Sequence, residues 1–121
     1  RIGELVWSND TSLRDWRKVI KRLSLRFEDH RALYHLPYHK GDRFYSGNII
    51  LHMPQRAACP VALLRRYVIV CDVVHGAKAA LFLTSAGDVP TRLWFDRKFF
   101  ATLSREFGGH SARAGGATFY A

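Results

Sequence analysis

Three short segments of the sequence carry cations or an imidazole of the kinds that suit chemistry on a phosphate. Arg1 begins Arg-Ile-Gly-Glu-Leu, Lys40 lies in Pro-Tyr-His-Lys-Gly-Asp at residues 37–42, and His110 begins His-Ser-Ala-Arg, which ends at Arg113. A guanidinium group presents a planar fork of donors that matches phosphate geometry and stays charged at biological pH. An ammonium group can protonate a leaving oxygen, and an imidazole titrates near neutrality. Such groups together could cleave a phosphodiester.

In this order, the three segments resemble the motifs of the tyrosine recombinase family, also called phage-type integrases, which break and rejoin DNA. The first is similar to the family's Arg-x-Gly-Glu-Leu signature, and the second to its hairpin segment with a catalytic lysine. The third, which continues as Ala-Gly-Gly-Ala-Thr after Arg113, resembles its His-x-x-Arg motif. The resemblance spans essentially the whole chain and is nearest to the integrase-like sequences of eukaryotic mobile elements.

The resemblance implies a catalytic role for four residues. Arg1 and Arg113 would hold the scissile phosphate, where negative charge builds up during the reaction. Lys40 would be the general acid for the leaving 5′-oxygen, and His110 would bind the phosphate and help to move the nucleophile's proton. Because a covalent phosphotyrosine intermediate conserves the energy of the bond, we expect no cofactor, neither ATP nor Mg²⁺.

The expected partner is double-stranded DNA, with Arg22, Arg26 and Arg43 as further DNA contacts. Recombinases of this family assemble on DNA as multimers, so we expect the same of the intact protein. No small-molecule substrate and no membrane are expected. The resemblance also implies an intracellular location, in the nucleus if the organism is eukaryotic.

The family's nucleophilic tyrosine lies well beyond the His-x-x-Arg helix, and the sequence contains no counterpart at such a position. Tyr120 follows Arg113 by seven residues in the same predicted helix. A separation of nearly two turns directs it toward the core or the solvent. We therefore expect residues 1–121 to form a single, partial catalytic domain, truncated at its C-terminus and inactive by itself.

Net charge supports a polyanionic partner independently of the motifs. Lys and Arg number 19 against 10 Asp and Glu, a formal charge of +9 with a pI near 10.2. Residues 1–66 hold 13 of the basic and 6 of the acidic side chains, so the surplus is concentrated there. Neutralising phosphates releases counterions and drives non-specific binding to nucleic acids. A solvated basic surface would have the same composition.

Two other functions stay open on the sequence alone. One is a non-catalytic, basic DNA-binding remnant of a mobile element. The other is a protein-interaction domain in which Arg22 and Arg26 meet an acidic partner. The individual residues also have structural alternatives: Lys40 as a solvated lysine, Arg113 as a salt-bridge partner of Glu106, and His110 as the start of a helix.

Residue periodicity predicts the elements that position these residues. Residues 1–7 read as the end of a helix, and Leu23, Leu25 and Phe27 alternate with basic or polar residues as in a strand. A turn at residues 28–31 precedes a second strand with Ala32, Tyr34 and Leu36 at period two, and residues 49–51 form a third apolar run. We expect a small antiparallel three-stranded sheet, with Lys40 at its second connection or at the edge of that connection.

Helical periodicity dominates after Pro60, which suits the first turn of a helix. The apolar face of that helix is expected to hold Leu63, Leu64, Tyr67, Val68 and Cys71. Residues 81–83 read as a short extended piece. Thr91 can cap a second helix, in which Phe95, Phe99, Phe100 and Phe107 are expected to be core residues, and a last helix starts near residue 110. The predicted class is therefore α+β, mainly helical with a small sheet, and incomplete at both ends.

Several classes of protein are not expected from this sequence. No apolar run approaches the roughly 18 residues of a membrane-spanning helix, and the first residues do not resemble a signal peptide. The histidines lack metal-ligand spacing, so no metal site is expected. The two cysteines, Cys59 and Cys71, are expected to be reduced and buried.

Overall fold

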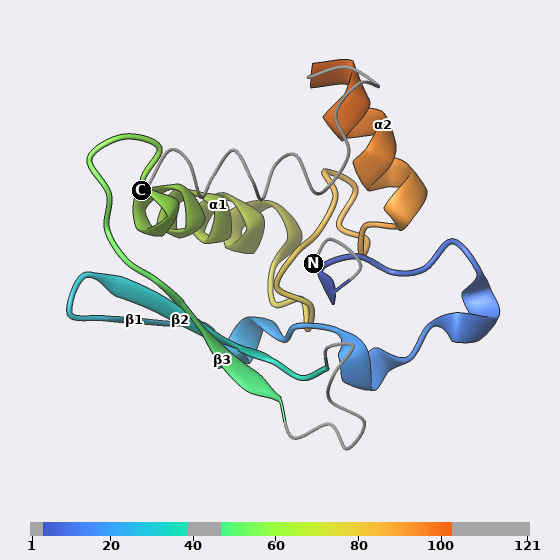
Figure 1. Ribbon diagram of the computed structural model, residues 1–121, viewed down its shortest axis with the longest axis horizontal. Coiled ribbons are helices and arrows are strands. Elements are labelled where there is room, and N and C mark those ends of the chain that lie inside the picture. The colour runs from blue at the N-terminus through green and yellow to red at the C-terminus, as the bar shows by residue number, and fades with distance from the viewer. Residues whose placement is uncertain (1–3, 39–46, 103–121) are drawn as a thin grey trace.

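The computed structural model describes residues 4–38 and 47–102, which form a small sheet covered on one face by a helix (Figure 1). Three short 3-10 helices lead into the sheet, at Thr11–Leu13, Trp16–Lys18 and Arg22–Ser24. The predicted α+β class with a small antiparallel sheet is confirmed. The strands are β1 (Arg26–Glu28), β2 (Arg31–Leu36) and β3 (Asn48–His52), and the helices are α1 (Pro60–His75) and α2 (Arg92–Thr102).

The sheet has the order β1-β2-β3, and both pairs of strands are antiparallel. Asp29 and His30 form the β1–β2 turn with φ of 49° and 64°. Positive φ at both positions gives a two-residue turn whose twist matches that of the strands it joins. The β2–β3 pair closes with Leu36 opposite Asn48, so residues 37–47 connect these strands. The turn between the first two strands and the antiparallel three-stranded sheet are as predicted, although β1 begins later than predicted.

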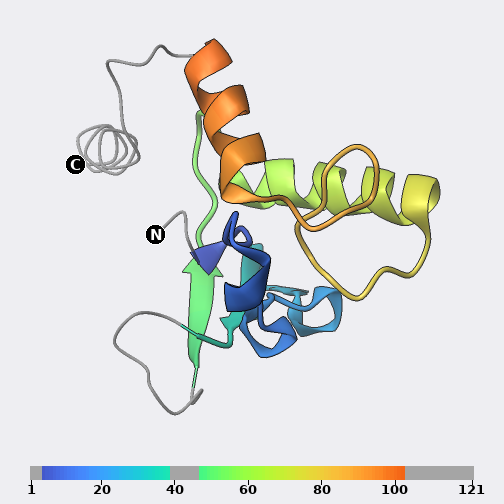
Figure 2. The same ribbon diagram turned by 90° about the vertical axis from the view of Figure 1, so that its right-hand side faces the viewer.

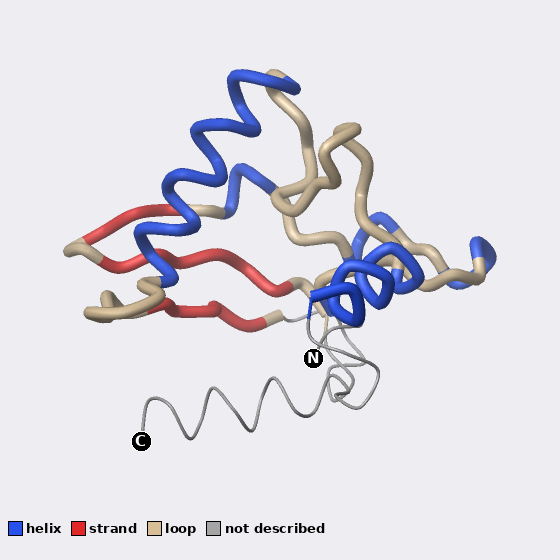
Figure 3. Tube along the Cα trace, turned by 90° about the horizontal axis from the view of Figure 1, so that it is seen from above, coloured by secondary structure: helices blue, strands red, loops and turns tan. Residues whose placement is uncertain are grey.

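The inward face of β2 supplies the centre of the core. Ala32, Tyr34 and Leu36 are buried, with exposed fractions of 0, 6 and 6%, and they alternate with half-buried residues as the period-two pattern predicted. Helix α1 lies across this face (Figure 3) and buries Val61 and Leu64 against it. The core cluster is completed by Val68 of α1 and by Ile20, Leu25 and Leu81 from other segments.

Helix α1 begins with Pro60 in its first turn, as predicted, and ends at Gly76, whose φ is 71°. Its inner face is only partly the predicted one, because Leu64 is buried whereas Leu63 is 54% exposed. Tyr67 is half-buried, and its hydroxyl group bonds to the segment after the helix. It accepts from the Leu83 amide at 2.7 Å and donates to the Leu81 carbonyl at 3.1 Å. These two hydrogen bonds hold the segment at residues 81–83 against α1.

Helix α2 extends away from the sheet (Figure 2). Thr91 caps it as predicted, because its hydroxyl accepts from the Trp94 amide at 3.2 Å. The Asn9 side chain also accepts from the Leu93 amide at 2.8 Å. The start of α2 is thereby joined to the N-terminal segment, which pairs with it at Trp7 and Thr91. Among the described residues, no helix is long and apolar enough to cross a membrane.

Two predicted elements at the N-terminal end are wrong. Residues 5–7 are not helical, since Trp7 exchanges backbone hydrogen bonds of 2.8 Å with Pro90 and Arg92. The first strand does not begin near Leu23, which is 96% exposed in a 3-10 helix. The Arg22 amide instead donates to the Ala79 carbonyl at 2.8 Å. In both places, a partner distant in the sequence has replaced the predicted local structure.

The prediction that the aromatic residues of α2 are core residues is also wrong for those that the structure describes. Phe95, Phe99 and Phe100 are each only half-buried, and α2 has no buried residue over its described length. The rings pack on one another, with 5.7 Å between the centroids of Phe95 and Phe99 and 5.6 Å between those of Phe99 and Phe100. Phe107 and the predicted last helix lie outside the described residues.

Candidate functional site

All four predicted catalytic residues lie outside the described part of the chain. This holds for Arg1, Lys40, His110 and Arg113, and also for Arg43 among the predicted DNA contacts. Their roles stay predictions. Two described residues close to them in the sequence lie at the same cavity. These are Glu4, which follows Arg1, and Tyr38, which precedes Lys40.

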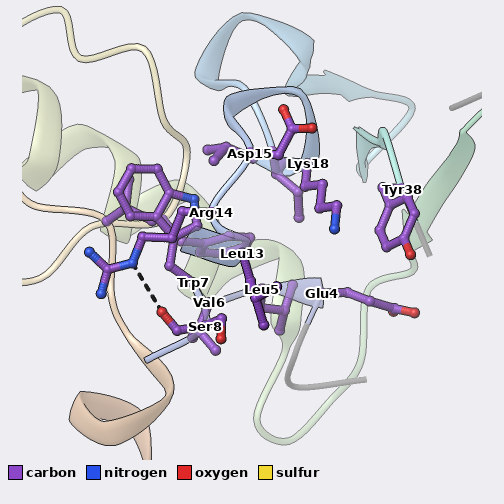
Figure 4. A pocket seen from close by; sticks show the side chains of 14 residues that line it. Glu4, Leu5, Val6, Trp7, Ser8, Leu13, Arg14, Asp15, Lys18 and Tyr38 are labelled. Atoms are coloured by element: carbon purple, nitrogen blue, oxygen red, sulfur yellow. Dashed lines mark hydrogen bonds between the residues drawn. The ribbon is translucent and has the colours of Figure 1, made fainter. Parts of the chain in front are cut away.

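Glu4 and Tyr38 line the same cavity, which encloses about 250 Å³ (Figure 4). The cavity lies between the N-terminal segment, the 3-10 helices that follow it and the end of β2. Its wall is largely apolar and includes the buried residues Val6, Val19 and Ile20. The polar side chains that line it are those of Glu4, Ser8, Arg14, Asp15, Lys18 and Tyr38.

Two cations of the cavity are held against aromatic rings. The Lys18 ammonium lies 4.4 Å from the centroid of the Tyr38 ring, and Figure 4 shows it pointing toward that ring. The Arg14 guanidinium lies 5.3 Å from the Trp7 ring, and its Nε donates to the Ser8 carbonyl at 3.0 Å. Cation–π contacts of this kind orient a cation. The carboxylates of Glu4 and Asp15 line the same cavity, and Arg14 also interacts electrostatically with Asp10, so Lys18 is the cation of the cavity that is better suited to bind an anion.

The cavity also contains a buried donor that has no partner. The indole Nε1 of Trp7 is buried and makes no hydrogen bond within the described chain. Trp7 is fixed by its backbone bonds and by an edge-to-face contact with Trp16, whose ring centroid is 6.1 Å away. A buried N–H without a partner is costly, and such groups in folded proteins usually need an explanation.

The two described arginines that we predicted as DNA contacts both have carboxylate partners. Arg22 forms two hydrogen bonds with Asp72 of α1, the shorter at 2.8 Å, and its side chain is 29% exposed. These bonds lower the pKa of the Asp72 carboxyl. Arg26 lies 3.5 Å from Glu28 and is 61% exposed. Arg22 thus joins its 3-10 helix to α1, and a DNA contact by either arginine stays a prediction.

Lys21 has a structural position although it lies in the same basic stretch as Lys18. Its ammonium donates to the Val19 carbonyl at 2.8 Å and to the Trp16 carbonyl. Burial lowers the pKa of this lysine. Because its donors are already used by the chain, Lys21 is less suited than Lys18 to bind an external anion.

Other titratable groups lie apart from the cavity. The His52 Nε2 and the Tyr34 hydroxyl are 3.2 Å apart, and burial lowers the pKa of His52 and raises that of Tyr34. Both groups are therefore neutral near pH 7 and form a polar pair beside the core.

Cys59 and Cys71 are free thiols, in agreement with the prediction that they are reduced. They are half-buried, so the prediction that they are buried is wrong. No cluster of potential metal ligands occurs among the described residues.

The sequence showed that the basic surplus lies in residues 1–66 but did not mark Lys18, Arg14, Trp7 or Tyr38 as site residues. Of these, only Lys18 lies in a helix or strand, so no period marks the four as neighbours. The chain matches no protein-family model, no curated protein and no solved structure. The assignment of a function therefore depends on the residues themselves.

Proposed function

We propose that this chain is part of the catalytic domain of a tyrosine recombinase, which cuts and rejoins DNA through a phosphotyrosine intermediate. The observation that supports it most is the shared cavity of Glu4 and Tyr38. In the sequence, Arg1 is three residues before Glu4, and Lys40 is two residues after Tyr38. The cavity is therefore lined by a described residue from the flank of each of two predicted catalytic residues.

The sheet gives a second line of support. Lys40 belongs to the connection between β2 and β3, which are antiparallel neighbours. The resemblance requires a lysine in this connection, because a flexible side chain there can reach into a groove of DNA. The cavity adds cations of its own, Arg14 and Lys18, near the flanks of the predicted catalytic residues.

In the proposed reaction, a tyrosine hydroxyl attacks the scissile phosphorus and the 5′-oxygen leaves. Arg1 and Arg113 stabilise the negative charge that builds up on the non-bridging oxygens. These oxygens bind guanidinium groups most strongly in the transition state, where their charge is greatest. Lys40 gives a proton to the leaving 5′-oxygen, and His110 helps to remove the proton of the nucleophile. The new phosphotyrosine bond replaces the broken phosphodiester bond, so rejoining needs no external energy.

The test is the formation of a covalent protein–DNA adduct. The chain is fused to a downstream segment that bears the family's tyrosine, and it is incubated with a nicked suicide substrate that traps the intermediate. We expect an adduct that resists denaturation, and a loss of about 100-fold or more in its rate for Lys40→Ala or Arg113→Ala. Lys78→Ala, an exposed lysine outside the cavity, is the matched control and should react at the unaltered rate.

A second candidate function is a non-catalytic DNA-binding module, which the +9 charge favours. Salt-dependent binding to DNA fits both functions and cannot separate them. Persistent absence of the adduct in a fusion that folds and binds DNA well would favour the module. If the folded chain binds no polyanion at all, an acidic protein partner becomes the better explanation.

A further inference from the structure

We infer that Lys18 binds a backbone phosphate of the DNA at the cavity and that the Tyr38 ring positions its ammonium group. The inference rests on the proposed function only in taking DNA as the ligand. It assigns a role to Lys18, which lies outside the three motif segments, and to Tyr38, which lies in the second of them but has no role in the resemblance.

The backbone of Lys18 is firmly held. Lys18 ends the 3-10 helix Trp16–Lys18, and its amide donates to the Asp15 carbonyl at 2.9 Å. The next two residues, Val19 and Ile20, are core residues with exposed fractions of 7 and 3%. The side chain therefore starts from a rigid point, and its half-buried stem lies along the cavity. A cation that is fixed before binding loses little entropy when a ligand arrives.

The charge of Lys18 has no carboxylate counterion within the described chain. The nearest carboxylate in the sequence, Asp15, is engaged by Arg17, whose guanidinium lies 2.7 Å from it. Asp15 also accepts from the Arg17 amide at 2.9 Å. Lys18 instead faces the Tyr38 ring at 4.4 Å. A ring orients an ammonium group without neutralising it, so the cation keeps its full attraction for an anion.

Under the proposed function, the anion that this pair binds is a DNA phosphate. In the sequence, Tyr38 is two residues before the predicted catalytic Lys40. A duplex carries one negative charge for about every 1.7 Å of its axis, so a neighbouring phosphate is always available. Lys18 would thus set the register of the DNA on the cavity and carry no sequence information.

The experiment measures the affinity of the chain for a mixed-sequence DNA duplex over a range of salt concentrations. We expect Lys18→Gln to weaken binding about equally for different sequences and to reduce the slope of log K against log salt by about 0.9, the value for one lost phosphate contact. Lys98→Gln is the matched control, because Lys98 also lies over an aromatic ring, that of Trp94 at 5.9 Å, but does not line the cavity. It should keep the slope of the parent chain.

Variants of Tyr38 test the positioning role. Tyr38→Phe keeps the ring and should bind DNA as the parent does, whereas Tyr38→Leu should weaken binding nearly as much as Lys18→Gln. The double variant with Lys18→Gln and Tyr38→Leu should then be little weaker than either single variant. Thermal unfolding of each variant checks that it folds.

The failures of the two proposals can be told apart. If the folded parent chain does not bind DNA, the proposed function fails. If the parent binds DNA and Lys18→Gln has the same affinity and salt slope as Lys98→Gln, the proposed function stands and the role of Lys18 is overturned. Additive effects of the Lys18 and Tyr38 substitutions would overturn the positioning role of the ring.

Discussion

Both sides of α1 carry apolar residues, but their surroundings are opposite. The side that faces the sheet buries Val61, Leu64 and Val68. Away from the sheet, the helix exposes the apolar residues Leu63, Ile69, Val70, Val73 and Val74, with exposed fractions from 54 to 81%. Charged residues are exposed there too: Arg65, Arg66 and Asp72. The periodicity of the sequence predicted this helix. Among the described residues, the position of the sheet determines which side of the helix is buried.

The same contrast separates the sheet from α2. The inward residues of β2 are buried in a common core, whereas the aromatic residues of α2 pack mainly on one another. We infer that the stability of the described structure is concentrated in the sheet and the inner side of α1. Helix α2 depends more on its cap and on its contacts with the N-terminal segment.

The largest effect should come from the two adjacent leucines of α1. Leu64→Ala removes a side chain that is 9% exposed in the core, and we expect it to lower the free energy of unfolding by about 2–4 kcal/mol. Leu63→Ala removes the same atoms from a site that is 54% exposed, and it should cost about 0.5 kcal/mol or less. Urea unfolding of the two variants measures both values. Equal costs would mean that the outer side of α1 is covered as well as the inner side.

A smaller effect is expected from the cap of α2. Thr91→Ala removes the acceptor for the Trp94 amide and should destabilise the helix by about 1 kcal/mol. Thr102→Ala is the control at the other end, where the exposed hydroxyl donates to the Lys98 carbonyl at 3.0 Å and has no capping role. Hydrogen exchange should show faster exchange of the α2 amides in the Thr91 variant, and unchanged exchange in β2. If the β2 amides also exchanged faster, α2 and the sheet would form one cooperative unit.

The smallest effect concerns the ion pair that joins the 3-10 helix at Arg22–Ser24 to α1. The hydrogen bonds from Arg22 hold the pKa of Asp72 below its ordinary value. A carboxyl with a lowered pKa in the folded state stabilises the fold above its unfolded pKa of about 3.9, and this contribution disappears as the pH falls through the folded pKa. Thermal unfolding should therefore show the parent chain more stable than Asp72→Asn near pH 6, and the difference shrinking as the pH falls below about 3.9. A difference that persists at low pH would show that charge is not its cause.

Much of the sheet was predictable from local patterns. The alternation of Ala32, Tyr34 and Leu36 and the turn at Asp29-His30 specify a hairpin through neighbouring residues alone. Pro60 and Thr91 likewise marked the starts of both helices. The strand predicted around Leu23 failed because Arg22 pairs with Ala79, more than 50 residues away, and no local period reports such a contact.

The candidate site was predictable only in part. The motifs indicated Arg1, Lys40, His110 and Arg113 by their types and order, and these predictions fall outside the described residues. The motifs gave no role to the cavity residues Trp7, Lys18 and Tyr38, because each comes from a different segment. Tertiary contacts bring them together, including the pairing of Trp7 with Thr91 and the contact of Lys18 with the Tyr38 ring.

The sequence by itself determined the hairpin, the starts of the helices, the charge and the residue types that suit a phosphodiester. These properties depend on neighbours in the chain, where backbone preferences and periodicity act. The tertiary structure alone decided which side of α1 is buried, which arginines are paired with carboxylates, and that Glu4 and Tyr38 share a cavity. Those properties depend on contacts between distant segments, whose energies are set by packing in three dimensions.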